Sequence, residues 1–236
     1  MKPILVIQHI PSDGPGNFGR WLAARGRRLE LIETFRAIAI PRDISPYAGL
    51  CVLGGPMHAH DPLPHLDHTV ALIRASVMNR IPVIGHCLGG QLLARAMGAQ
   101  VIRHTEPELG WHLIERLNNP DARRWLGAEH AHTVLQWHYD TFGLPAGAIP
   151  IARSAICENQ AYTLDGIHLG MQFHVEGDPQ KVNDWCDECS DDLAEAAHFR
   201  GVQQSAPMRA GTAVHFPAME KLAFQLYDEW SKALKS

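Results

Sequence analysis

The first half of the chain alternates short apolar runs with segments whose apolar residues recur at helical spacing. Runs rich in β-branched residues predict buried strands, and the periodic segments predict helices that cover them. The expected strands are 4–10, 29–35, 47–53 and 81–84, and the expected helices are 18–26, 67–79 and 88–97. This alternation predicts an α/β fold with a mostly parallel central sheet and flanking helices on both of its faces.

After residue 98 the pattern changes to the alternation of antiparallel strands, so we expect added antiparallel strands in the second half. These strands are expected at 101–104, 111–116, 131–137, 150–154, 161–164 and 169–173. A polar helix over 178–200, a loop rich in small residues and a terminal helix over 216–234 should follow. No linker is visible, so we predict a single domain over 1–236, with a core at about 1–178 and a C-terminal helical extension at 179–236.

The segment 85–90, Gly-His-Cys-Leu-Gly-Gly, joins a predicted buried strand directly to a predicted helix. Glycines on both sides of the apex are typical of a nucleophile elbow, where the apex backbone is strained and a neighbouring Cβ would collide with strand or helix. The apex is Cys87, whose sulfur would lie at the helix N-terminus, a position that stabilises thiolate. The amide of Leu88 is a candidate oxyanion donor. Taken alone, the segment is equally compatible with a buried structural cysteine.

A cysteine nucleophile needs a base, and the base needs an orienting group. The chain has 15 histidines, so position must select among them. His174 follows the apolar run 169–173 and would lie at the carboxyl edge of the sheet, toward which the elbow also points. In extended chain Glu176 projects to the same side as His174 and would orient its ring. The nearest rival base, His104, has no strand-end carboxylate beside it.

Three weaker signals surround the elbow. The turn 54–56, Gly-Gly-Pro, follows a predicted buried strand, and Gly55 is a candidate second oxyanion donor, although a plain tight turn has the same appearance. Gln91 lies one helical turn past the apex and would face the pocket, unless it is simply solvated. Residues 137–142 should form a turn that lines a pocket, or else a locally satisfied cluster. The candidate groups there are His138, Tyr139 and Asp140.

Together these residues resemble the class I glutamine amidotransferase family, of the Cys-His-Glu type. Segment 85–91 is similar to its G-x-C-x-G-x-Q motif, 174–176 to its H-P-E motif and 54–56 to its oxyanion G-G-P. Stretches such as GHCLGGQLLARAMGA, WHYDTFGLP and LGMQFHVE are similar to the stand-alone GMP synthase-like subgroup. Two positions depart from the family pattern: Val175 replaces the proline of the H-P-E motif, and His86 stands where the subgroup usually has an apolar residue.

The resemblance implies a flavodoxin-like amidotransferase fold and hydrolysis of the γ-amide of glutamine. Cys87 would form a γ-glutamyl thioester and release ammonia, while His174 moves the protons and Glu176 orients His174. The N–H groups of Gly55 and Leu88 would hold the oxyanion. No cofactor and no metal is expected for this reaction.

The resemblance also implies how substrate binds. Gln91 would contact it, and residues of the 138–142 segment would hold its α-amino and carboxylate groups. Two functions stay open. Ammonia would pass to a separate synthetase subunit, because the chain has no P-loop or other nucleotide-binding glycine pattern; alternatively, the protein is a free-standing γ-glutamyl hydrolase that acts on γ-glutamyl amines or peptides.

Two further classes fit less well. A non-catalytic binding domain predicts a damaged triad, whereas the motif residues here are intact. The chaperone and glyoxalase-like families with a cysteine elbow place their histidine soon after the cysteine, whereas His174 follows the whole β-rich half.

Composition limits which partners, location and cysteine chemistry we expect. A net charge of -4 argues against nucleic acid or an anionic membrane as the main partner. No run is long enough to span a membrane, and no signal peptide is apparent, so a cytoplasmic location is expected. The five scattered cysteines do not suggest a disulfide framework. Cys186 and Cys189 look like half of a zinc or redox motif, but a helical surface pair is the favoured interpretation. The histidine-rich stretch 58–68 receives no role.

Overall fold

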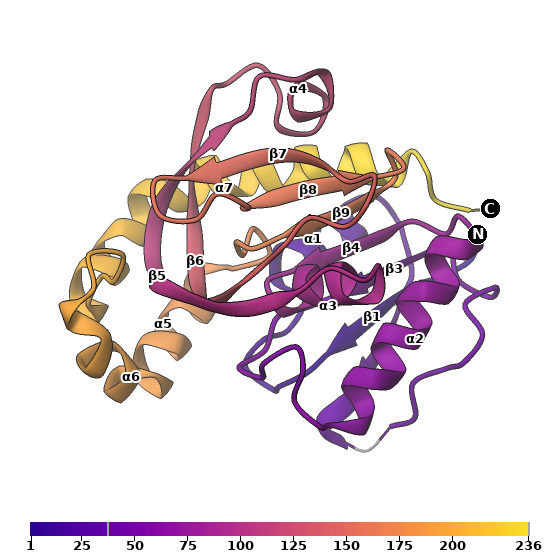
Figure 1. Cartoon of the computed structure of the whole chain (residues 1–236), viewed down its shortest axis with the longest axis horizontal. Helices are drawn as coiled ribbons and strands as arrows, with labels where there is room; N and C mark the ends of the chain where they lie inside the picture. Colours follow the sequence, from indigo (N-terminus) through magenta and orange to yellow (C-terminus); the bar gives the residue numbers. More distant parts are fainter. Residues whose placement is uncertain (37, 236) are drawn as a thin grey trace.

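The computed structural model describes residues 1–36 and 38–235, and within them the strands form one nine-stranded sheet of order β2-β1-β3-β4-β9-β8-β7-β5-β6 (Figure 1). The first five strands pair in parallel, and the remaining pairings are antiparallel. The parallel strands are β2 (Leu29–Glu33), β1 (Ile4–Gln8), β3 (Gly49–Val52), β4 (Val83–His86) and β9 (His168–Met171). The antiparallel strands are β8 (Ala161–Leu164), β7 (Ile149–Ser154), β5 (Val101–Arg116) and β6 (Ala131–Phe142).

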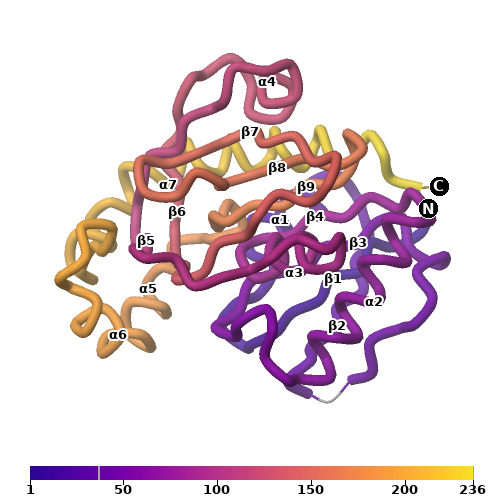
Figure 2. Tube along the Cα trace, viewed as in Figure 1, coloured from indigo at the N-terminus to yellow at the C-terminus, as the bar shows by residue number. Residues whose placement is uncertain are grey.

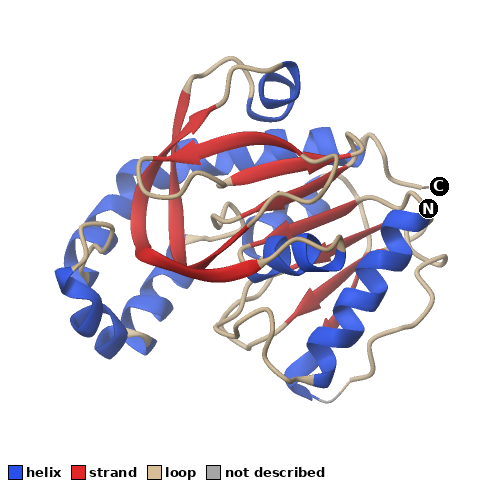
Figure 3. Cartoon of the chain, viewed as in Figure 1, coloured by secondary structure: helices blue, strands red, loops and turns tan. Residues whose placement is uncertain are grey.

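Helices cover both faces of the parallel half, as the sequence predicts. Alternate residues of β1 enter two different cores: Ile4 and Val6 pack with α1 (Gly16–Ala24) and α7 (Ser205–Ser231), whereas Leu5 and Ile7 pack with α2 (Pro64–Met78) and α3 (Leu88–Ala96). Figure 3 shows this arrangement of helices and strands. The predicted α/β class, with a flavodoxin-like parallel part and added antiparallel strands, is therefore confirmed.

The antiparallel half differs from the prediction at β5 and β6. The strands expected at 101–104 and 111–116 are one strand, β5, whose register with β6 shifts between Arg103 and Glu108. This irregularity interrupts the alternation of apolar and polar residues, which explains why the sequence pattern suggests two strands. β6 continues to Phe142, so the residues expected to form a turn at 137–142 are part of a strand.

The C-terminal part also differs. The helix expected over 178–200 is divided into α5 (Pro179–Glu188), α6 (Ser190–Glu195) and the 3₁₀ turn η2 (Ala196–His198). The expected small-residue loop is instead the first part of α7. Its small side chains reflect close packing on β5, since a Cβ on Gly211 would lie 2.8 Å from Cδ1 of Trp111. The 3₁₀ turn η1 (Thr34–Arg36) and helix α4 (Pro120–Leu126) were not predicted.

The two ends of the chain meet at Ala48, just before β3. The Ala48 amide donates to the Pro3 carbonyl at 2.8 Å, and the Lys235 amide donates to the Ala48 carbonyl at 3.0 Å, so α7 returns the chain to its start (Figure 2). The proposed boundary between a core and an extension at residue 178 stays a prediction. Among the helices of residues 1–36 and 38–235, none has both the length and the apolar composition that crossing a membrane requires.

Candidate functional site

The elbow forms where β4 ends. Cys87 has φ 48° and ψ -108°, a conformation that is costly for a residue with a side chain, and it caps the N-terminus of α3. Its amide donates to the Met171 carbonyl of β9 at 2.9 Å, and its carbonyl accepts from the Gln91 amide at 3.0 Å. These two hydrogen bonds fix the strained residue between the neighbouring strand and the first turn of the helix.

The glycines beside Cys87 are required by the packing, as predicted. A Cβ on Gly85 would lie 2.4 Å from the Gly89 backbone. One on Gly89 would lie 2.0 Å from the Val52 carbonyl oxygen, and one on Gly90 would lie 2.4 Å from that of Met171. Because these contacts are with backbone, no side-chain rotation can relieve them.

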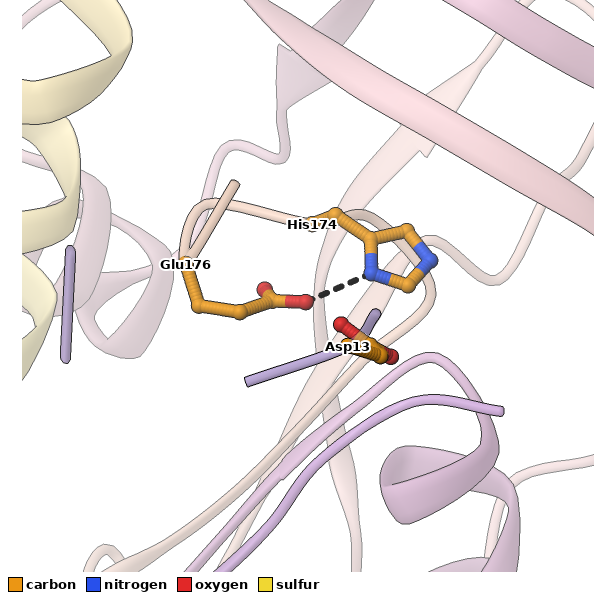
Figure 4. Close-up of side chains that lie close together, drawn as sticks. All are labelled: Asp13, His174 and Glu176. Atoms are coloured by element: carbon orange, nitrogen blue, oxygen red, sulfur yellow. Dashed lines mark hydrogen bonds and ion pairs between the residues drawn. The ribbon is translucent and has the colours of Figure 1, made fainter. Parts of the chain in front are cut away.

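His174 and Glu176 lie together in the turn after β9. Nδ1 of His174 is 2.6 Å from Oε1 of Glu176, and both side chains are buried (Figure 4). The two side chains meet for a different reason from the one predicted, which was alternation along an extended chain. β9 ends at Met171, and residues 174–177 form a turn in which the Gly177 amide donates to the His174 carbonyl. The backbone of His174 is anchored by donation to the Leu135 carbonyl of β6.

The electrostatics of this pair favour a protonated imidazole beside the sulfur. Burial lowers the pKa of His174, but the charges of Glu176 and Cys87 and the hydrogen bond with Glu176 outweigh it and hold that pKa well above its ordinary range. Burial raises the pKa of Glu176, but the same histidine reverses the effect and keeps the carboxylate ionised. An imidazolium is the partner that stabilises a thiolate.

A second buried ion pair adjoins the first and was missed by the sequence analysis. Nζ of Lys181, on α5, is 2.6 Å from Oδ1 of Asp13 and 3.9 Å from Oε1 of Glu176. Burial lowers the pKa of Lys181, but the charges of Asp13 and Glu176 raise it by more than burial lowers it, so the ammonium stays charged. Asp13 stands in a Pro/Gly-rich loop and Lys181 in a polar helix, so nothing in the local pattern indicates that either is buried.

Asp13, His174 and Glu176 are also the residues that come nearest to a metal site in the described part of the chain. Their ligand atoms lie within 4.8 Å of one another (Figure 4). However, Nδ1 of His174 already contacts Glu176 at 2.6 Å, and Asp13 already faces the Lys181 ammonium. The donor set therefore fits an ion-pair network better than it fits a resident cation.

A pocket opens above Cys87 and brings together most of the predicted site. His174, Gly55 and Gln91 line it with the cysteine. A Cβ on Gly54 would lie 2.8 Å from Cε1 of His174, so this turn must be glycine to admit the imidazole. Leu88 begins α3, so its N–H is one of those at a helix start that have no partner within the helix.

Gln91 reaches the sulfur through a residue that the sequence analysis did not select. Its Nε2 donates to Oε1 of Gln172 at 3.3 Å, and Nε2 of Gln172 donates to Sγ of Cys87 at 3.5 Å. Sγ also lies 3.7 Å from the Trp137 carbonyl oxygen of β6. Gln172 belongs to the same LGMQFHVE stretch as His174, and its place in that stretch is the signal that would have found it.

The three candidate binding residues on β6 line the pocket but are not equivalent. His138 already uses both ring nitrogens, with Nε2 3.1 Å from Oε2 of Glu108 and Nδ1 3.0 Å from the Asp140 carbonyl oxygen. The Tyr139 ring lies beneath the Arg103 guanidinium, 4.3 Å away. Asp140 is 7% exposed, and its Oδ1 makes no hydrogen bond within the described residues but lies 3.7 Å from Nη1 of Arg103, so it can still accept a hydrogen bond from a ligand.

Other candidates lie elsewhere or have different surroundings from those expected. His104 is absent from the pocket wall, and its Nδ1 lies 2.7 Å from the Glu106 carbonyl oxygen. The interpretation of Cys186 and Cys189 as a surface pair was wrong: Cys186 is buried against Met208, and only Cys189 is partly exposed, at the pocket. The histidine-rich stretch also touches the site, because Nε2 of His58 is 3.5 Å from Oδ2 of Asp140.

Comparisons with known proteins identify the family of this chain. The family model described as glutamine amidotransferase class-I matches residues 13–184. The glutamine amidotransferase-like protein YfeJ of Salmonella typhimurium is 29% identical over 234 residues, which cover 96% of each chain. The crystal structure of a glutamine amidotransferase from Methylobacillus flagellatus is 39% identical and superposes with a TM-score of 0.97, covering 100% of this chain and 96% of that one. A GMP synthase of Porphyromonas gingivalis is 28% identical over 157 residues, which are 64% of this chain and 30% of the synthase.

Proposed function

Because the chain belongs to the class I glutamine amidotransferase family, we propose that it hydrolyses the γ-amide of glutamine with Cys87 as nucleophile, His174 as acid and base, and Glu176 as the orienting carboxylate. One observation carries this proposal: a buried, strained elbow cysteine shares a pocket with a histidine whose far nitrogen is held by a carboxylate at 2.6 Å. This is the arrangement that nucleophilic acyl transfer requires.

In the first half-reaction, Sγ of Cys87 attacks the amide carbon, and the carbonyl π electrons move to oxygen. The N–H groups of Gly55 and Leu88 donate to this oxyanion, and the helix dipole of α3 adds to their effect. The C–N bond then breaks while His174 passes its proton to the departing nitrogen. The products are ammonia and a γ-glutamyl thioester on Cys87.

In the second half-reaction, water attacks the thioester carbon, and Nε2 of His174 accepts a water proton. The C–S bond breaks, glutamate leaves, and the thiolate–imidazolium pair is restored. Nε2 has no hydrogen-bond partner within the described residues, so it is free to face each reacting atom in turn. Glu176 stabilises the imidazolium through both half-reactions without taking its proton.

Substrate recognition is assigned to the β5–β6 wall. Oδ1 of Asp140, which lies 3.7 Å from Nη1 of Arg103 but makes no hydrogen bond within the described residues, would accept from the α-ammonium of glutamine, and Gln91 would contact the bound substrate beside the sulfur. The Arg103 guanidinium, which stacks on Tyr139 at the pocket wall, is placed to pair with the α-carboxylate. His138 lines the pocket but has both ring nitrogens engaged, so we assign it the support of this wall.

The released ammonia would be used by a separate synthetase. Support comes from the GMP synthase relative, because the similarity covers 30% of that protein, which joins glutamine hydrolysis to synthesis. The present chain has no nucleotide-binding glycine motif with which to activate an acceptor.

The pocket mouth favours a second candidate, a hydrolase that acts on γ-glutamyl amides of cationic amines. Glu188 and Asp192, exposed residues near the junction of α5 and α6, line the pocket together with Asp140. The Asp192 charge acts on the β6 wall, since burial and then this charge raise the pKa of Tyr139. Three carboxylates against one guanidinium give this mouth a negative balance, which attracts an amine leaving group with a second positive charge.

The first test is ammonia release from glutamine by the wild type, Cys87→Ala and Cys157→Ala. Cys157 is a buried cysteine outside the pocket, so its variant controls for the loss of a buried thiol. We expect release by the wild type and Cys157→Ala, and none by Cys87→Ala. Turnover that survives in Cys87→Ala would contradict the mechanism. A parallel panel of γ-glutamyl amines separates the two candidates, because faster release of a cationic amine than of ammonia supports the hydrolase.

A further inference from the structure

The side of Glu176 that faces away from His174 has an unusual environment. Oε2 of Glu176 is fully buried and has no hydrogen-bond partner within the described residues. The nitrogen facing it is Nε2 of His86, at 3.9 Å, and the same nitrogen lies 3.2 Å from the Tyr227 hydroxyl. All three side chains are buried. A buried carboxylate oxygen without a donor is costly, so these neighbours must contribute to holding it.

The chemistry of the surrounding groups selects one tautomer of His86. Burial lowers its pKa, so the ring is neutral and carries one proton. Nδ1 faces Sγ of Cys51 at 3.9 Å, and burial raises the pKa of that thiol well above its ordinary range, so the sulfur keeps a proton to donate. Nδ1 is therefore the acceptor, and Nε2 carries the proton, with the Tyr227 oxygen 3.2 Å away and Oε2 of Glu176 3.9 Å away.

We propose that His86 and Tyr227 form a buried support behind Glu176, through which the C-terminal helix α7 positions the catalytic carboxylate. This inference rests on the proposed function. His86 precedes Cys87 on β4, whereas Tyr227 lies on α7, which is outside the 13–184 family match. The support thus joins the elbow to a segment for which the family motifs give no role.

The groups around Glu176 divide its two oxygens between them. His174 and Lys181 face Oε1, and Asp13 acts there only through Lys181. His86 faces Oε2, and Tyr227 stands behind His86. With donors on one oxygen alone the carboxylate could rotate, and the His174 ring would rotate with it. His86 and Tyr227 are positioning residues, since they act on the reaction through Glu176.

The test must separate hydrogen bonding from packing, because Tyr227 also packs its ring edge against Phe18, with centroids 4.9 Å apart. Tyr227→Phe keeps the ring and removes only the oxygen. Tyr162→Phe is the matched control, because Tyr162 is another fully buried tyrosine, and its hydroxyl donates to the Gly90 carbonyl at 3.0 Å. At the other residue, His86→Gln keeps an N–H donor, and His86→Leu has none.

Two readouts are measured on the full chain: kcat and KM for ammonia release, and the pH dependence of Cys87 alkylation by iodoacetamide. For Tyr227→Phe we expect kcat to fall about tenfold with KM unchanged, which is the effect of one hydrogen bond in a charged network. The alkylation midpoint should move to higher pH, because a less well-held Glu176 stabilises the imidazolium less. Tyr162→Phe should stay within about twofold of the wild type, and His86→Gln should retain more activity than His86→Leu.

A double-mutant cycle decides whether the effect passes through Glu176. In a Glu176→Gln background, Tyr227→Phe should change the alkylation rate by less than about twofold, because the charge that the support holds is gone. Equal effects in both backgrounds, or wild-type behaviour of Tyr227→Phe in both readouts, would overturn the inference. Alkylation needs no substrate, so a wild type that releases no ammonia would contradict the proposed function while the support is still tested.

Discussion

The parallel and antiparallel halves of the sheet contribute to the site in different ways. The parallel half provides the reacting groups, at the ends of β3, β4 and β9, and places them through backbone geometry. Cys87 is fixed by two backbone hydrogen bonds and by glycines that touch the neighbouring backbone. The antiparallel half, with α5 and α6, provides the pocket wall and mouth, where charged side chains such as Arg103 and Asp192 reach solvent.

This difference separates two properties, the reaction itself and the choice of amide, which can change independently of each other. A Cβ added at Gly85, Gly89 or Gly90 would lie 2.0–2.4 Å from backbone atoms, so these positions permit glycine alone and the parallel half tolerates almost no substitution near the elbow. Exposed carboxylates such as Glu188 contribute through screened electrostatics, so the mouth can change its charge at small cost. We therefore expect the reaction to depend on the parallel half and the choice of amide to depend on the antiparallel half and α5–α6.

The largest effect should come from Gly89→Ala. The new Cβ would lie 2.0 Å from the Val52 carbonyl oxygen, so α3 or β3 must shift and Cys87 must move with it. A displacement of this size should cost roughly 100-fold in kcat/KM and about 3 kcal/mol in the free energy of unfolding. Gly143→Ala, just after β6, is the control: its Cβ would meet nothing nearer than 3.6 Å, and activity and urea stability should stay close to the wild type. Equal effects of the two variants would remove the distinction between the halves.

The same contrast explains what the sequence could predict. The elbow, the Gly54–Gly55 turn and the His174–Glu176 pair follow from glycine and motif positions at strand ends, and so does the family. The fold class follows from the alternation of apolar runs with segments of helical spacing. Asp13 and Lys181 could not be predicted, because each looks solvated until α5 folds over the loop before α1 and pairs them. The continuous β5 strand was missed because its register shift breaks the alternation, and the first part of α7 because small residues that permit close packing resemble a loop.

The electrostatic pair of the parallel half should show in the pH dependence of stability. The pKa of His174 is raised in the folded state, so its contribution is complete below the unfolded value near 6.5 and is lost as pH rises toward the folded value. Glu176→Gln removes the main charge that raises this pKa. The stability difference between the glutamate and glutamine forms should therefore shrink above pH 6.5, by up to about 1.4 kcal/mol per pH unit.

Urea unfolding between pH 6 and 9 measures this difference, with both forms carrying Cys87→Ala so that the thiol does not titrate. Buried neutral histidines such as His9 and His168, whose pKa values fall to about 3 and about 4, shift both forms equally and cancel in the difference. A difference that stays constant with pH would show that the His174–Glu176 pair is not charged in the folded protein.

The smallest effect is expected at the pocket mouth, and it tests most directly whether the antiparallel half and α5–α6 determine the choice of amide. In Glu188→Gln/Asp192→Asn, KM for a γ-glutamyl amide of a diamine should rise about fivefold, while KM for glutamine stays unchanged, because exposed carboxylates act on the second positive charge of the amine alone. Asp191→Asn is the matched control, since Asp191 is the exposed neighbour of Asp192 on α6 but lies outside the pocket wall. The rise should disappear in high salt, where exposed charges are screened. If KM for glutamine and for the amide rose together, the mouth would belong to the general binding machinery, and the assignment of specificity to the antiparallel half and α5–α6 would be wrong.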